Sequence, residues 1–187
     1  MKSIIRFDRL LVAAALAAVA ALSLAQAVHA GPAAPEVPGT IAVEEGQKPF
    51  LIANAVGVQI YACSTAGATY RWSLVAPRAD LFEQNGKFLG THFGGPSWQA
   101  KDGSLVKAAL ERRVTVDPTA IDWFLLRVTY AAAGSDGARL AGTTFIQRVQ
   151  TTGGLAPAAE SCNAETFGDV EEIPYTAVYA FWKASGS

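Results

Sequence analysis

The fold of this chain is indicated first by the stretch Val58-Gln59-Ile60-Tyr61-Ala62-Cys63, in which Val58, Ile60 and Ala62 alternate with the other three side chains. Alternation with a period of two is typical of a β-strand, because successive side chains point to opposite faces of a sheet. A second alternation follows at residues 69–75. The two patterns predict strands over residues 50–63 and 69–75.

Further short strands follow, separated by turn-forming residues. We expect them at residues 86–93, 98–100, 121–132, 138–151 and 175–183. The strands 121–132 and 138–151 are predicted to form a hairpin across residues 134–137, which contain two glycines. Residues 105–113 are ambiguous, because they favour a helix capped by Ser104, whereas the β-branched residues that follow favour a strand. The chain is therefore predicted to be all-β, an antiparallel β-sandwich or barrel in a single domain.

The composition excludes several classes of protein. The chain has 187 residues, of which 51% are hydrophobic and 17% charged, and its formal net charge is −1. Such a chain can bury a core and is neither disordered nor a polyelectrolyte. It has no basic cluster of the kind that binds nucleic acid.

Residues 1–30 have the organisation of a secretory signal peptide. Three basic residues precede an unbroken apolar run, which leads to the small-residue pattern Val28-His29-Ala30. The alternative interpretation is an uncleaved membrane anchor. Residues 31–45 are Pro-rich and predict an extended linker, and residues 46–187 predict the domain. We expect an exported protein, periplasmic or extracellular, with no stable membrane insertion after cleavage.

The only cysteines, Cys63 and Cys162, both follow the predicted signal. An oxidising compartment favours a disulfide between them, closing a loop of about 100 residues. The alternative, a reactive thiol, would need an activating histidine or a resolving cysteine nearby.

A series of short motifs in fixed order resembles a secreted bacterial and fungal family, catalogued as domain of unknown function 3455. The motifs include residues 57–63, 90–98, 102–104, 146–151 and 175–179, and the resemblance extends from about Gly57 to the C-terminus. Some members of that family carry a malate dehydrogenase label. This sequence does not support that activity, because it lacks a Gly-x-Gly-x-x-Gly motif that opens a helix after a strand.

His92, Trp98 and Asp102 lie on one Gly-rich stretch and form the first candidate site. His92 is the only histidine after residue 30, which excludes a multi-histidine metal centre within one chain, and we expect neither metal nor cofactor. A Ser-His-Asp arrangement with Ser97 or Ser104 is formally possible if the turn brings Asp102 beside His92. The alternative is structural: His92 ends a strand and hydrogen-bonds the Asp102 turn.

Arg148 is the second candidate. It neighbours Gln147 in a predicted strand, so one of the two side chains can point to the core. A buried arginine needs a partner, for which Asp80, Asp122 and Glu172 are available, and the alternative is an anion-binding site. For Gln59 too, the alternatives are a structural role in its strand and a part in a binding site. Among the tryptophans, Trp98 is the best candidate for an exposed ligand platform, although packing in the core or at its rim is favoured.

These observations predict a non-enzymatic protein that binds a small molecule, a glycan or an envelope component. The alternatives are a hydrolase-like enzyme that uses the His92 loop, and a purely structural surface or envelope protein. Convergence of the candidate residues on a concave pocket would favour binding or catalysis over a structural role.

Overall fold

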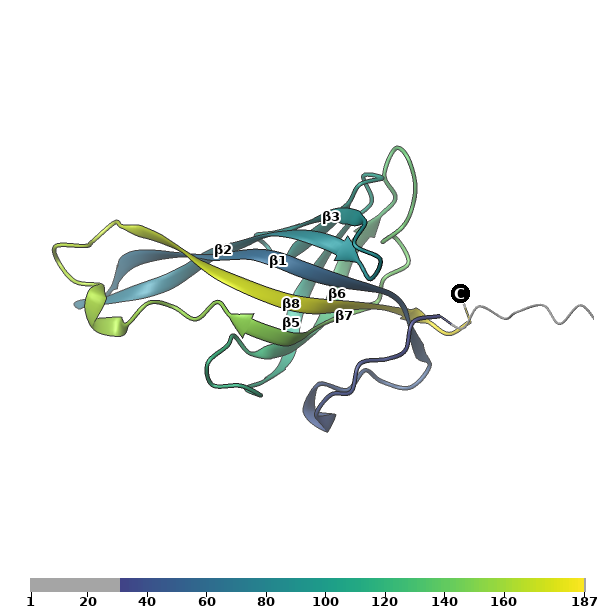
Figure 1. Ribbon diagram of the computed structural model, residues 1–187, viewed down its shortest axis with the longest axis horizontal. Coiled ribbons are helices and arrows are strands. Elements are labelled where there is room, and N and C mark those ends of the chain that lie inside the picture. Colours follow the sequence, from purple (N-terminus) through teal and green to yellow (C-terminus); the bar gives the residue numbers. More distant parts are fainter. Residues whose placement is uncertain (1–30, 187) are drawn as a thin grey trace, which may run out of the picture.

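The structure, a computed structural model that describes residues 31–186, is a closed antiparallel β-barrel (Figure 1). Each strand pairs with the next along the chain, and β8 pairs back with β1. The strands are β1 (Gln47–Ala66), β2 (Thr69–Glu83), β3 (Phe88–Phe93), β4 (Ser97–Ala100), β5 (Leu105–Val114), β6 (Trp123–Ala132), β7 (Phe145–Gly153) and β8 (Val170–Ala184). The predicted all-β, single-domain fold is confirmed, and of its two forms the barrel is the correct one.

The ambiguous residues 105–113 form the strand β5. Val106 and Ala108 are buried inside the barrel, and β5 is paired along its length with β6. Tertiary burial on one face thus outweighs the helix propensity of this segment.

The predicted hairpin is correct in its pairing, since β6 pairs with β7, but wrong in the length of its connection. Residues 133–144 all lie outside strands. Leu140 turns into the barrel and is fully buried, while its backbone N–H donates to the Ser104 hydroxyl at 3.1 Å. The connection is therefore long because it folds over one end of the barrel and closes it.

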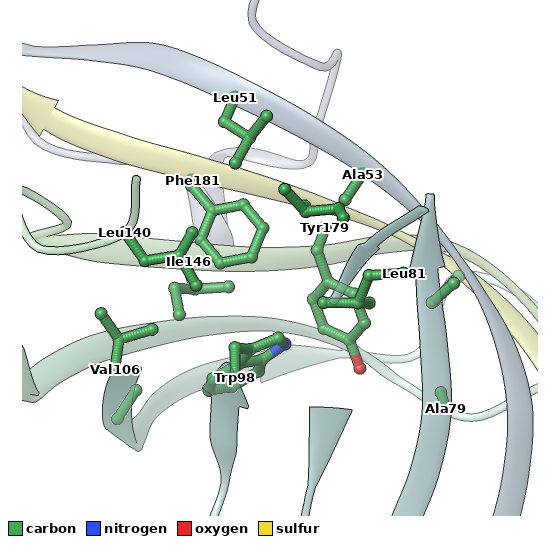
Figure 2. Close-up of a cluster of buried hydrophobic side chains, with 14 of the residues drawn as sticks. Leu51, Ala53, Ala79, Leu81, Trp98, Val106, Leu140, Ile146, Tyr179 and Phe181 are labelled. Carbon is green, nitrogen blue, oxygen red and sulfur yellow. The ribbon is translucent and has the colours of Figure 1, made fainter. Parts of the chain in front are cut away.

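The main core fills the barrel interior (Figure 2). Large side chains such as Trp98, Tyr179 and Phe181 face short ones such as Ala53 and Ala79. Gly57 lies opposite Ala79, and a Cβ at Gly57 would come within 2.5 Å of the Ala79 Cβ. Small residues on β1 and β2 thus leave the room that the aromatic rings on β4 and β8 occupy.

A second apolar cluster lies on the outer face of β6, β7 and β8. The N-terminal segment covers it, because Ile41 of the short 3-10 helix η1 (Gly39–Ile41) is fully buried there, flanked by Val37 and Val43. Gln147 points to this outer face, where its Nε2 donates to the Ile41 carbonyl at 2.7 Å. Part of the stretch predicted as a linker therefore packs on the barrel.

On one side β1, β2 and β8 extend beyond the other strands as a long twisted arm (Figure 1). At its end lies the connection between β7 and β8, which carries the 3-10 helix η2 (Ala159–Ser161). The predicted disulfide is confirmed and joins Cys63 of β1 to Cys162 beside η2. It fastens the β7–β8 connection to the arm.

The predicted signal peptide lies outside the described residues. Within residues 31–186, no helix has the length and apolar character needed to cross a membrane.

Candidate functional site

Two cross-strand rows of side chains meet inside the barrel, at the end from which the arm extends. In the first row, His92 of β3 is paired with Trp98 of β4. In the second, Arg148 of β7 lies between Phe124 of β6 and Tyr179 of β8. Directly paired residues project their side chains from the same face of a sheet, so the ladder itself brings these five side chains to the inner face.

His92 is held in an aromatic stack. Its ring lies parallel to Trp98, with centroids 4.4 Å apart, and meets the edge of Tyr179 at 5.1 Å. His92 Nδ1 lies 2.9 Å from the Ser97 carbonyl oxygen. A carbonyl only accepts, so Nδ1 carries the proton and Nε2 keeps a lone pair. Burial lowers the pKa of His92 to about 3, and the ring is neutral at ordinary pH.

Arg148 is buried, but its charge has no partner. Its Nε and Nη2 donate to the Asp122 backbone carbonyl at 3.1 and 2.8 Å, and the guanidinium lies 3.8 Å from the centroid of the Phe124 ring. Among residues 31–186, no carboxylate lies within ion-pairing distance of it.

All three carboxylates predicted as partners of Arg148 lie elsewhere. The Asp122 carboxylate accepts from Thr115, and Glu172 pairs with Arg78. Asp80 is exposed, on the face of β2 opposite to the buried Ala79. The structural ion pair that the sequence favoured for Arg148 is therefore wrong.

Several buried polar atoms around this row have no hydrogen-bond partner in the described chain. They are Gln59 Nε2, Trp98 Nε1 and the hydroxyls of Tyr175 and Tyr179, of which the two hydroxyls lie near each other and that of Tyr179 lies near Arg148. Each of these side chains is at least 97% buried. Burial also raises the pKa of both tyrosine hydroxyls, so they remain protonated. Buried groups of this kind are normally paired, and leaving one unpaired costs about 1–3 kcal/mol.

Gln59, Trp98 and Tyr179, but not Tyr175, line a cavity of about 80 Å³ at the arm end of the barrel. Its polar lining comes from Gln59, His92, Trp98, Arg148 and Tyr179, and its apolar lining from Leu74, Pro77, Pro96, Phe124 and Leu126. The Trp98 and Tyr179 rings meet edge to face inside the barrel, with centroids 5.5 Å apart (Figure 2). The cavity is large enough for several water molecules or a small organic group.

The structure brings together three of the four predicted site residues. His92, Trp98 and Arg148 line the cavity, whereas Asp102 lies in the turn after β4, at the opposite end of that strand from the Gly94–Pro96 turn. Trp98 is only 1% exposed, so the favoured interpretation, packing in the core, is confirmed and the alternative of an exposed platform is wrong: its indole points into the barrel. Gln59, Tyr179 and Phe124 also line the cavity, and of these the sequence singled out Gln59 as a polar candidate.

Asp102 organises the closed end of the barrel. Its Oδ1 accepts from the Ser104 backbone N–H and hydroxyl, and its Oδ2 accepts from the Arg139 N–H at 2.8 Å. These hydrogen bonds lower the pKa of the Asp102 carboxyl. The expected contact between His92 and the Asp102 turn does not form, because His92 bonds to Ser97 at the other end of β4.

We expect Asp102→Ala to lower the free energy of unfolding by about 1–2 kcal/mol, because it removes charge-assisted hydrogen bonds at a partly exposed site. Urea denaturation measures this loss. Asp136→Ala is the matched control, since Asp136 is an exposed aspartate in the same loop region, and should have little effect. Equal stability of the two variants would contradict this role for Asp102.

The site lacks the arrangement of a serine hydrolase. The Ser97 hydroxyl donates to the Gly95 carbonyl, and the Ser104 hydroxyl donates to Asp102, so neither is activated by His92. In the described part of the chain, no three His, Cys, Asp or Glu side chains are grouped as metal ligands would be.

The family model for proteins of unknown function DUF3455 matches residues 44–183, which include all eight strands except the last residue of β8. The chain belongs to the DUF3455 family. The resemblance seen in the sequence motifs is thereby confirmed. No curated protein and no solved structure matches this DUF3455 chain. Its cavity must therefore be interpreted from its own chemistry.

Proposed function

We propose that this protein binds a small molecule in the cavity at the arm end of its barrel, and that it does so without transforming it. The proposal is supported chiefly by two buried polar atoms without partners, Gln59 Nε2 and Trp98 Nε1. In a purely structural barrel these positions would be more stable with apolar side chains. A ligand that supplies their hydrogen bonds accounts for their presence.

The size of the cavity favours a small molecule over a glycan. Cavities for drug-sized ligands measure roughly 300–1,000 Å³. The volume here, about 80 Å³, suits a group of a few heavy atoms. A sugar chain or an envelope polymer would find no extended groove in this cavity.

Binding is favoured over catalysis by the state of His92. A histidine with a pKa of about 3 is a weak base at neutral pH, and no carboxylate orients its ring. The site also offers no activated nucleophile. We further infer export of the protein, with which the Cys63–Cys162 disulfide is compatible.

The test is a thermal-shift screen of the purified protein with sugars, organic acids and phenolics, followed by calorimetry of the hits. A ligand at about 100 times its Kd should stabilise the fold by roughly 2.7 kcal/mol. Gln59→Leu removes an unpartnered buried amide while keeping a side chain of similar size. We expect this variant to be as stable as the parent, or about 1–3 kcal/mol more stable, and to lose most of the ligand-induced shift.

Gln99→Leu is the control, because Gln99 is exposed and lies on the other face of β4 from Trp98. It should leave the ligand response unchanged. An unchanged response in Gln59→Leu would place the bound ligand elsewhere and contradict the proposal. The absence of any hit across the screen would also contradict it.

A further inference from the structure

We propose that the ligand of this cavity is a small monocarboxylic acid with an apolar body, bound as its anion with the carboxylate directed to Arg148. This inference rests on the proposed binding function and specifies the ligand class. It follows from three properties of the cavity: its net charge, the kind of polar atoms that line it, and the division between its polar and apolar walls.

The first property is an uncompensated positive charge. Arg148 is 8% exposed, and its guanidinium donates to the neutral Asp122 carbonyl, with the neutral Tyr179 hydroxyl close by. His92 is neutral because burial lowers its pKa, and protonated tyrosines carry no charge. The cavity therefore holds one positive charge in a site of low dielectric constant, where a single negative charge is strongly favoured.

The second property is an excess of hydrogen-bond donors. The Trp98 indole and the Arg148 guanidinium have no acceptor atoms, and Gln59 presents an unpartnered Nε2 amide donor. The Tyr179 hydroxyl can also donate. A carboxylate accepts several hydrogen bonds and donates none, so it satisfies this set. A primary amide of the same shape has only one acceptor oxygen for these donors, and its NH₂ would find few acceptors, chiefly the His92 Nε2.

The third property is the apolar part of the wall. Leu74, Pro77 and Pro96 line the cavity, and Leu74 is 54% exposed, so this side reaches the surface. An apolar cavity of about 150 Å³ holds benzene. The smaller volume here takes the carboxylate and the atoms next to it, while the rest of an apolar body would lie against Leu74 and the two prolines.

A matched control for Arg148 exists in the same barrel. Arg127 of β6 also lies over a phenylalanine, with its guanidinium 4.4 Å from the Phe145 ring centroid. Arg127 is exposed and pairs with Glu111 and Glu44. The two arginines thus share the aromatic contact and differ in burial and in the presence of a counter-charge.

The experiment measures the affinity of the purified protein for propanoate, butanoate and benzoate, each compared with its primary amide, by calorimetry at pH 7. We expect each acid that binds to do so at least about tenfold more tightly than its amide. Inorganic phosphate, largely a dianion at this pH, should bind more weakly than the acids. Arg148→Met should lose the preference for the acid, whereas Arg127→Met should retain it.

The comparison of acid with amide uses the unaltered protein, so it decides the question even if Arg148→Met does not fold. Equal affinity for acids and amides, or tighter binding of sugars or neutral phenols, would overturn the carboxylate inference and leave the binding function standing. Preference for phosphate over every acid would also overturn it. If no compound binds in this series or in the wider screen, both the inference and the proposed function fail.

Discussion

Removal of the disulfide with the double variant Cys63→Ala/Cys162→Ala is expected to lower the free energy of unfolding by about 2–5 kcal/mol. The two cysteines are 99 residues apart in the sequence, and the chain-entropy estimate for a loop of about 100 residues is roughly 4.7 kcal/mol. The bond therefore restricts most of the domain in its unfolded state. Guanidinium denaturation of the oxidised protein and of the variant measures the difference.

Reduction provides the internal control for this prediction. Dithiothreitol should destabilise the parent protein by a similar amount and should leave the double variant unchanged. Equal stability of the oxidised and reduced parent would contradict the expected effect.

Acidification is expected to destabilise the protein through His92, before most carboxylates titrate. The folded protein keeps this ring neutral down to a pKa of about 3, whereas in the unfolded chain it takes up a proton near pH 6.5. Between these values the unfolded state binds one proton more, so stability falls as the pH falls. The loss is about 1.4 kcal/mol per pH unit, in total on the order of 5 kcal/mol between pH 6.5 and 3.

The variant His92→Gln isolates this effect. Its amide can still donate to the Ser97 carbonyl, but it does not titrate. The free energy of unfolding, measured by urea denaturation at pH 7, 6 and 5, should fall with falling pH in the parent and stay nearly constant in the variant. Asp102 and Asp117, whose pKa values are lowered by hydrogen bonds, lose their contributions only below about pH 4. A parent curve as flat as that of the variant would contradict the buried, neutral histidine.

The fold could be predicted from the sequence because alternation and turn residues are local signals. The 69–75 alternation and the Gly94-Gly95-Pro96 turn each correspond to an observed strand or strand end. The cysteine pair could be predicted because only one pairing exists. The choice between helix and strand for residues 105–113 could not be made from the sequence. The burial of Val106 and Ala108 depends on pairing with β6, whose partner residues lie 20 or more positions further along the chain.

The site could be predicted only in part. Hydrophobicity alone would place Val58 and Ile60 inside, yet the structure turns Gln59 and Tyr61 inward, and both are buried. Asp102 is near His92 in sequence, but the intervening strand β4 separates them. Arg148 meets Tyr179 and Phe124 through strand registers that no local pattern specifies. Contacts between residues on neighbouring strands are thus the part of the site that composition and sequence spacing do not reveal.

The pairing of β8 with β1 makes closure of the barrel a contact between the two ends of the domain. The ladder joins Gln47 to Ala184 and Ala62 to Val170, so it links the two ends of the domain. Because β8 is the last strand in the sequence, β1 can pair early with its neighbour β2, but its other edge stays open until β8 pairs with it. Such distant contacts carry a large loop-closure entropy and form slowly. Until β8 is in place, the free edges of β1 and β7 are open to pairing with other chains, so we expect this fifteen-residue strand to protect the chain from edge-to-edge aggregation.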